Sequence, residues 1–253
     1  MPDIAQGNSS HWVRVFSLVI FLLLWQLAAG FADAEILPAP YQVLLSLLRH
    51  LLDGELLFHV GVTLARVVIS FLLAMSIGVA LGIVMGRYKK WDAALDGILV
   101  FALNLPALVV IILCYLWFGL GEIAAIVAVT VNKFPVVVVN MREGARAVDQ
   151  DLLQVAAAFR LDRRRRLFQV YLPQLYPYLL LSARSGLALV WKIVLVVELL
   201  GRSNGVGFQL GIYFQFFDIQ SILAYSFAFI AVVMAIEYLL ISPLDRRLTK
   251  WRP

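Results

Sequence analysis

The sequence predicts an all-α polytopic membrane protein with about six transmembrane helices. Of its 253 residues, 62% are hydrophobic and only 15% are charged, whereas about a quarter of the residues of a typical soluble domain are charged. The apolar residues gather in runs of about 20, the length that a helix needs to cross the hydrocarbon core. Because lipid offers no hydrogen-bond partners to the backbone, helices are expected in these runs.

The apolar runs predict six spans, and the first has an alternative interpretation. Ala32 and Ala34 offer a small-residue cleavage site, as in a secretory signal. The apolar stretch before that site is 18 residues long, which exceeds the usual core of about 7–15 residues and favours a retained helix. The approximate ranges of the spans are 13–32, 62–86, 95–118, 122–141, 174–200 and 219–243.

Lysine and arginine residues predict the orientation of the spans. Fifteen of them fall on one side of the membrane, and only Arg49 and Arg202 fall on the other. Positively charged loops are retained in the cytoplasm, so both termini and the arginine-rich segment (150–173) are predicted to be cytoplasmic. On the opposite side, leucines recur at helical spacing in the segment 37–57, among charged residues. This pattern fits an interfacial helix and equally a simple connector.

The arginine-rich segment has a regular apolar pattern beside its four consecutive arginines. Leu152, Val155, Ala156 and Phe159 follow the 0, 3, 4, 7 spacing of one helical face. Asp162 is expected to cap a second short helix, which Pro173 is expected to end. Two short amphipathic helices of this kind would suit a groove on a partner protein. The alternative is a basic loop that rests on anionic lipid head groups.

The segment resembles the "EAA" coupling loop of ABC importer permeases, with the pattern Glu-Ala-Ala, three residues, Gly, nine residues, Ile-x-Leu-Pro. The Glu position falls on Gln154, the Ala positions on Val155 and Ala156, and the Gly position on Arg160. The Ile position falls on Val170, and the Leu-Pro pair matches Leu172 and Pro173. Further stretches, "LPAPYQVLLSLL", "LWFGLGE" and "VVELLGRSNGVGFQL", are similar to the nitrate/sulfonate/taurine branch of these permeases.

Two residues depart from the coupling-loop pattern. Gln154 lacks the charge of the usual Glu, although it can still form hydrogen bonds. Arg160 replaces the residue best able to adopt a left-handed backbone conformation, at a cost of roughly 1 kcal/mol. The resemblance implies that the segment docks on an ATPase through Gln154, Val155, Ala156, Phe159, Arg160, Asp162, Leu172 and Pro173.

The resemblance also implies partners and a cellular location. A permease of this type pairs with a second copy or a sister permease in the bacterial inner membrane, and an external solute-binding protein delivers a small anion such as a sulfonate or nitrate. The chain has no Gly-x4-Gly-Lys-Ser/Thr loop, so ATP and Mg²⁺ are expected on separate cytoplasmic ATPase subunits and no cofactor is expected in this chain. The chain is therefore expected to be a non-catalytic transport subunit.

Three residues inside the predicted spans are candidates for the solute pathway. Lys133 and Lys192 place charge within the membrane, where it is costly and often functional. Pro106 removes a backbone hydrogen bond from the third span and permits a kink.

Other functional classes receive little support from the sequence. The single cysteine, Cys114, excludes an intrachain disulfide and a CxxC motif. The three histidines lie outside the predicted spans, and no Ser-His-Asp set or metal-ligand spacing is present. The basic residues flank apolar spans, which indicates membrane topology rather than nucleic-acid binding. A secondary transporter or channel independent of an ATPase remains the alternative, although no repeated halves are visible.

Overall fold

The computed structural model describes residues 6–33, 35–52, 54–241 and 243 of the chain. The described residues are predominantly helical and contain no strand, and several of the helices are long and apolar. These features confirm the predicted all-α membrane fold. Ala34 of the alternative cleavage site and the basic tail 244–253 lie outside the described residues. The chain divides into two units, 1–58 with 209–231 and 59–208 with 232–253, which are described separately.

The first unit contains α1 (Gln6–Phe31), α2 (Pro40–Leu52), most of α10 (Val206–Gln215) and the greater part of α11 (Ile219–Ile236). Trp25 of α1 donates a hydrogen bond to the Pro38 carbonyl (3.1 Å), and its ring lies 5.8 Å from that of Phe227. His50 Nε2 lies 2.9 Å from Ser221 Oγ. The expected helix within 37–57 is therefore present as α2, and its position in the membrane interface stays a prediction.

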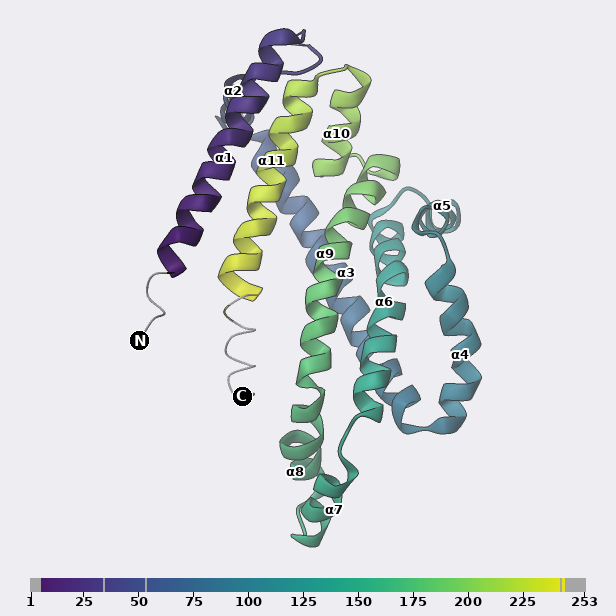
Figure 1. The fold of residues 1–253 in the computed structure, drawn as a ribbon. Coiled ribbons are helices and arrows are strands. Elements are labelled where there is room, and N and C mark those ends of the chain that lie inside the picture. The colour runs from purple at the N-terminus through teal and green to yellow at the C-terminus, as the bar shows by residue number, and fades with distance from the viewer. Residues whose placement is uncertain (1–5, 34, 53, 242, 244–253) are drawn as a thin grey trace. The chain divides into compact units, whose positions relative to one another are not determined.

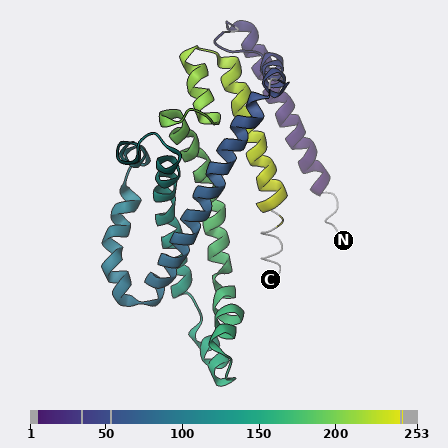
Figure 2. The ribbon, with the colours of Figure 1, turned by 180° about the vertical axis from the view of Figure 1, so that it is seen from behind.

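The second unit is built around a long helix hairpin. Helix α6 (Glu122–Arg146) runs antiparallel to α9 (Leu172–Gly201), and the two pack side by side in both views (Figures 1 and 2). Helix α3 (Glu55–Arg87) packs against α6 through three glycines spaced four residues apart. A Cβ atom added at Gly78, Gly82 or Gly86 would lie 2.5–2.6 Å from the Cβ atoms of Val137, Met141 and Ala145, respectively. The absence of side chains at these glycines lets the two backbones approach closely.

The third predicted span is broken at its proline. Helix α4 (Lys89–Asn104) ends before Leu105, and α5 (Ala107–Phe118) begins after Pro106, at an angle of 98°. The change of direction is visible in Figure 1, where α5 is seen end-on. A proline disfavours helical geometry in the preceding residue, and Leu105 has an extended backbone (φ −68°, ψ 125°). The range 95–118 therefore contains two helices with a sharp break at Pro106, and whether they form one span stays a prediction.

The expected number of six spans is not confirmed exactly. Among the described residues, four helices are long and apolar enough to cross a membrane, or five if α4 and α5 together form one span. These four are Glu55–Arg87, Glu122–Arg146, Arg163–Gly201 and Ile219–Leu239. Helix α1 is 26 residues long, and among the residues whose side chains are described its apolar part is Phe16–Phe31, so the first predicted span stays a prediction.

Candidate coupling segment and polar sites

The arginine-rich segment begins with a capped helix, α7 (Gln150–Ala158). Asp149 occupies the N-cap position, and its Oδ1 accepts hydrogen bonds from the backbone N–H groups of Asp151 (2.8 Å) and Leu152 (3.3 Å). The backbone N–H of Asp149 donates in turn to Gln174 Oε1 (2.8 Å) on α9. The start of α7 is therefore both capped and attached to the helix that follows the segment.

Helix α7 ends in a left-handed bend at Arg160. The N–H of Leu161 donates to the Ala156 carbonyl (3.1 Å), and the N–H of Arg160 donates to the Ala157 carbonyl (2.9 Å). This pair of bonds is the Schellman arrangement, which requires a left-handed residue after the helix. Arg160 has a φ of 55°. It therefore adopts the conformation that glycine adopts most easily, at the glycine position of the coupling-loop pattern.

Residue spacing predicts that Ala156 shares one docking face with Leu152, Val155 and Phe159, but the structure places these residues on two faces of α7. Leu152, Val155 and Phe159 form an exposed apolar surface, the outer face of α7, with 78% of Phe159 accessible. Gln154 is also exposed. Ala156 is buried, with only 4% accessible, so its expected place in the docking face is wrong. It lies on the other side of the helix with Leu153, which packs against the buried core.

The second half of the segment is one continuous helix rather than a separate short one. Helix α8 (Arg163–Arg165), the π-helical turn η1 (Arg166–Tyr171) and α9 follow without interruption. Asp162 occupies the N-cap position, but its side chain forms no capping hydrogen bond. Pro173 lies just after the π-helical turn η1, and a local π adjustment of this kind accommodates a proline inside a continuous helix. The structure therefore confirms Asp162 at the N-cap position but not its side-chain capping bond, and the expected helix end at Pro173 is wrong.

The inner side of the segment is anchored in the helix core. Tyr171 and Leu175 belong to a buried cluster with Met75 of α3 and Met141 of α6, and Leu172 packs against it. These contacts attach both α7, through Leu153, and the start of α9 to the same cluster. Because protein interiors are close-packed, a displacement of the segment would be transmitted to these helices.

The three pathway candidates lie in different surroundings in the structure. Lys133 of α6 is buried, with 1% accessible, and its Nζ has no hydrogen-bond partner among the described residues. It faces Gly186 of α9, where an added Cβ would lie 2.7 Å from Lys133 Cε. Lys192 is exposed, and Pro106 lies at the break between α4 and α5.

A polar network that spacing did not predict joins α3, α6 and α9. Arg66 Nη1 donates to Glu198 Oε1 (2.7 Å), and Arg66 Nε donates to Glu122 Oε2 (2.8 Å). Glu198 is fully buried, and its Oε2 accepts hydrogen bonds from Thr63 Oγ1 (2.9 Å) and the Gly207 N–H (2.9 Å). The buried carboxylate of Glu198 therefore accepts hydrogen bonds from Arg66, Thr63 and Gly207.

This network includes the loop that follows α9. Arg66 Nη1 donates to the Asn204 carbonyl (2.8 Å), and Arg66 Nη2 also contacts the Asn204 side chain. The Gly205 N–H donates to Nδ1 of His59 (2.9 Å), a buried residue of α3. The sequence offers one signal for this arrangement, the presence of Arg66, Glu122 and Glu198 near ends of predicted spans. Local spacing cannot show which of these charges meet.

No cluster of three or more His, Cys, Asp or Glu residues that could hold a metal ion occurs in the described part of the chain. The candidate sites are the exposed outer face of α7, the buried Lys133 and the ion-pair network around Glu198.

Comparisons with known proteins show the family of the chain. Residues 78–250 match the family described as "Binding-protein-dependent transport system inner membrane component". The chain is 32% identical over 244 residues to the "Putative aliphatic sulfonates transport permease protein" of Bacillus subtilis, covering 95% of this chain and 88% of the relative. It is 29% identical to the taurine transport system permease protein of Escherichia coli, covering 94% of this chain and 89% of the relative.

A solved structure has the same fold. A chain of the MetNI methionine ABC transporter, in an inward-facing conformation, superposes with a TM-score of 0.59 at 18% sequence identity. The match covers 74% of this chain and 91% of the solved one.

Proposed function

We propose that this chain is the membrane-embedded subunit of an ATP-driven importer. The premise is its family: the chain belongs to the binding-protein-dependent transport system inner membrane components. The outer face of α7 carries the proposal. Leu152, Val155 and Phe159 are exposed together, while the opposite side of α7 and the adjoining helix are held in the core. An exposed apolar helix face on a firmly anchored segment suits insertion into a groove of a partner protein.

In this proposal the arginine-rich segment docks on a cytoplasmic ATPase, which binds ATP and Mg²⁺. Closure of the ATPase would move the outer face of α7, and the buried cluster would pass the movement to α3, α6 and α9. Gln154 and Arg160 are exposed beside this face, where they supply polar contacts. The excess of positive charge in predicted cytoplasmic loops supports an inner-membrane location with both termini in the cytoplasm. A second copy or a sister permease would complete the transmembrane pathway.

A co-purification experiment tests the docking surface. The tagged chain is co-expressed with a candidate ABC ATPase of the same organism and purified in mild detergent, and retention of the ATPase is measured. Phe159→Asp should abolish retention because it places a charge at the centre of the apolar face. Ala157→Asp is the matched control, since Ala157 is exposed on the same helix but off that face. Equal retention by both variants would refute docking through the outer face of α7.

The proposed solute is a small anion such as an alkanesulfonate, taurine or nitrate, delivered by an external binding protein. The names of the relatives support this class, and the buried Lys133 supplies a positive charge within the helices. Uptake of labelled taurine, ethanesulfonate and nitrate by proteoliposomes that contain the complete transporter would test it. ATP-dependent uptake of any of them supports the class. Uptake that persists without the ATPase would instead favour a secondary transporter or channel.

A further inference from the structure

A second feature of the arginine-rich segment is a cavity of about 700 Å³ at its junction with α3 and α6. Its lining comes from the ends of α3 and α6, from α7, and from α8 and η1. The volume lies within the range of about 300–1,000 Å³ that is typical of small-ligand sites. We call this cavity the arginine pocket. Its charged and polar lining residues are Arg87, Arg146, Gln150, Arg163, Arg166 and Tyr171.

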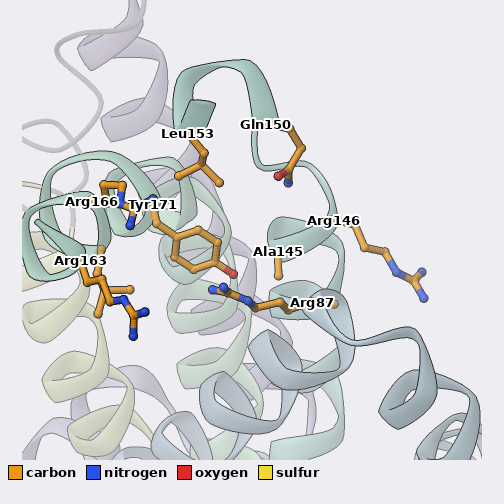
Figure 3. A pocket seen from close by; sticks show the side chains of 10 residues that line it. Arg87, Ala145, Arg146, Gln150, Leu153, Arg163, Arg166 and Tyr171 are labelled. Carbon is orange, nitrogen blue, oxygen red and sulfur yellow. The ribbon is translucent and has the colours of Figure 1, made fainter. Parts of the chain in front are cut away.

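The arginine pocket is strongly positive. Four arginines line it, and no aspartate or glutamate does among the described residues. Arg146 is already paired with Asp92 and Glu143 and points away from the others in Figure 3. Within the described part of the chain, Arg87, Arg163 and Arg166 form no ion pair. Three arginines, from α3, α8 and η1, thus line the cavity without a paired carboxylate.

A buried hydroxyl group adds a second, independent observation. Tyr171 is 7% accessible, and its hydroxyl has no hydrogen-bond partner among the described residues. In Figure 3 its ring extends into the pocket, with the hydroxyl directed toward Arg87. A buried hydroxyl without a partner is costly. A ligand that accepts a hydrogen bond would satisfy it.

We infer that the arginine pocket binds a phosphate-bearing anion. Arginine presents several N–H donors in a planar fork, which suits the oxygens of a phosphate group. Arg87 would contact the anion from the end of α3, Arg163 and Arg166 would contact it from the arginine-rich segment, and Tyr171 would donate from the wall. The same chemistry is offered by an anionic lipid head group and by a free phosphate compound. In either case the bound anion would tie α3 to the segment proposed to carry the movement.

Binding to the purified full-length chain tests this inference. Lipid is first removed by extensive detergent washing, and two probes are then used in parallel. Pyrophosphate is titrated calorimetrically, and phosphatidylglycerol is added in detergent and detected by native mass spectrometry, with phosphatidylcholine as the neutral comparison. Binding of pyrophosphate alone identifies a free anion as the ligand class, and binding of phosphatidylglycerol alone identifies a lipid head group. Absence of binding by both probes overturns the inference.

Two double variants separate a built site from general attraction to positive charge. Arg163→Gln with Arg166→Gln removes two charges from the pocket and should weaken binding at least tenfold. Arg164→Gln with Arg165→Gln removes the same charge from neighbouring exposed positions that do not line the pocket, and it should leave affinity within about threefold. Equal losses in both double variants would overturn the inference.

Tyr171→Phe supplies a test that leaves the charge unchanged. Loss of the hydroxyl should weaken binding about three- to tenfold, while the circular dichroism spectrum and gel-filtration volume stay those of the wild type. Arg87→Gln reports on the pocket from α3 if the double variant of the segment fails to fold. Wild-type affinity in both Tyr171→Phe and Arg87→Gln would show that the anion binds elsewhere.

Discussion

Removal of the Glu198 carboxylate is expected to destabilise the second unit far more than removal of Glu122, although both carboxylates pair with Arg66. Glu198 is fully buried, whereas 48% of the Glu122 side chain is accessible. Loss of one partner from a buried ion pair typically costs about 3–5 kcal/mol. A half-exposed pair contributes only about 0–1 kcal/mol, because water solvates its charges.

The contacts of Glu198 show where this cost arises. In Glu198→Ala the Gly207 N–H loses its acceptor, and a buried unsatisfied donor costs about 1–3 kcal/mol. The cost at Thr63 is smaller than at Gly207, because the Thr63 hydroxyl can donate instead to the His59 carbonyl, which lies 3.0 Å away. Arg66 keeps Glu122 and the Asn204 carbonyl but loses its fully buried partner. Together these losses predict a decrease of about 3–5 kcal/mol in the free energy of unfolding.

Equilibrium unfolding of the purified chain by sodium dodecyl sulfate, followed by circular dichroism, measures this difference. Glu122→Ala serves as the matched control, and Glu198→Gln should have an intermediate effect because its amide oxygen can still accept hydrogen bonds. Equal losses in Glu198→Ala and Glu122→Ala would refute the reasoning. So would a Glu198→Ala variant within about 1 kcal/mol of the wild type, since the carboxylate could then not be the buried centre of the network.

Three further substitutions test the backbone, the packing and the pathway. Arg160→Gly should raise the free energy of unfolding by about 1 kcal/mol, because glycine adopts the left-handed conformation without strain; a decrease would contradict this account of the bend. Gly82→Leu should lower the free energy of unfolding by at least about 1–3 kcal/mol, because the added side chain forces α3 away from α6. An unchanged free energy of unfolding would show that the close approach of the two helices is not needed. Lys133→Met should stabilise the fold by removing an unpartnered buried charge, while anion uptake falls at least tenfold. Unchanged uptake would exclude Lys133 from the pathway. Detergent unfolding and proteoliposome uptake provide the measurements.

Much of the fold follows from local sequence patterns. Apolar runs predict where the long helices lie, because burial in lipid depends mainly on residue type and length. Arg160 stands at the glycine position of the coupling-loop pattern, and it adopts the left-handed conformation that glycine takes most easily. Gly78, Gly82 and Gly86 lie four residues apart, a pattern typical of close helix packing, but the pattern does not show which helix lies against them.

The errors share a physical cause: they depend on contacts between elements. Helical spacing placed Ala156 with Phe159, but the buried cluster selects which side of α7 faces inward. The break at Pro106 is larger than a kink, because the extended backbone at Leu105 redirects the chain. Pairing of Arg66 with Glu198 joins residues 132 positions apart, a separation that no local pattern records.

The uninterrupted helix from Arg163 to Gly201 is long enough for a small tilt at one end to produce a large displacement at the other. Its 39 residues correspond to roughly 58 Å at about 1.5 Å per residue. A tilt of about 5° about the Arg163 end of a rod of this length moves its other end by about 5 Å, close to one helical turn. Glu198 lies three residues before that other end and forms an ion pair with Arg66. The ion-pair network is thus placed where a small rotation at the arginine-rich segment produces its greatest displacement.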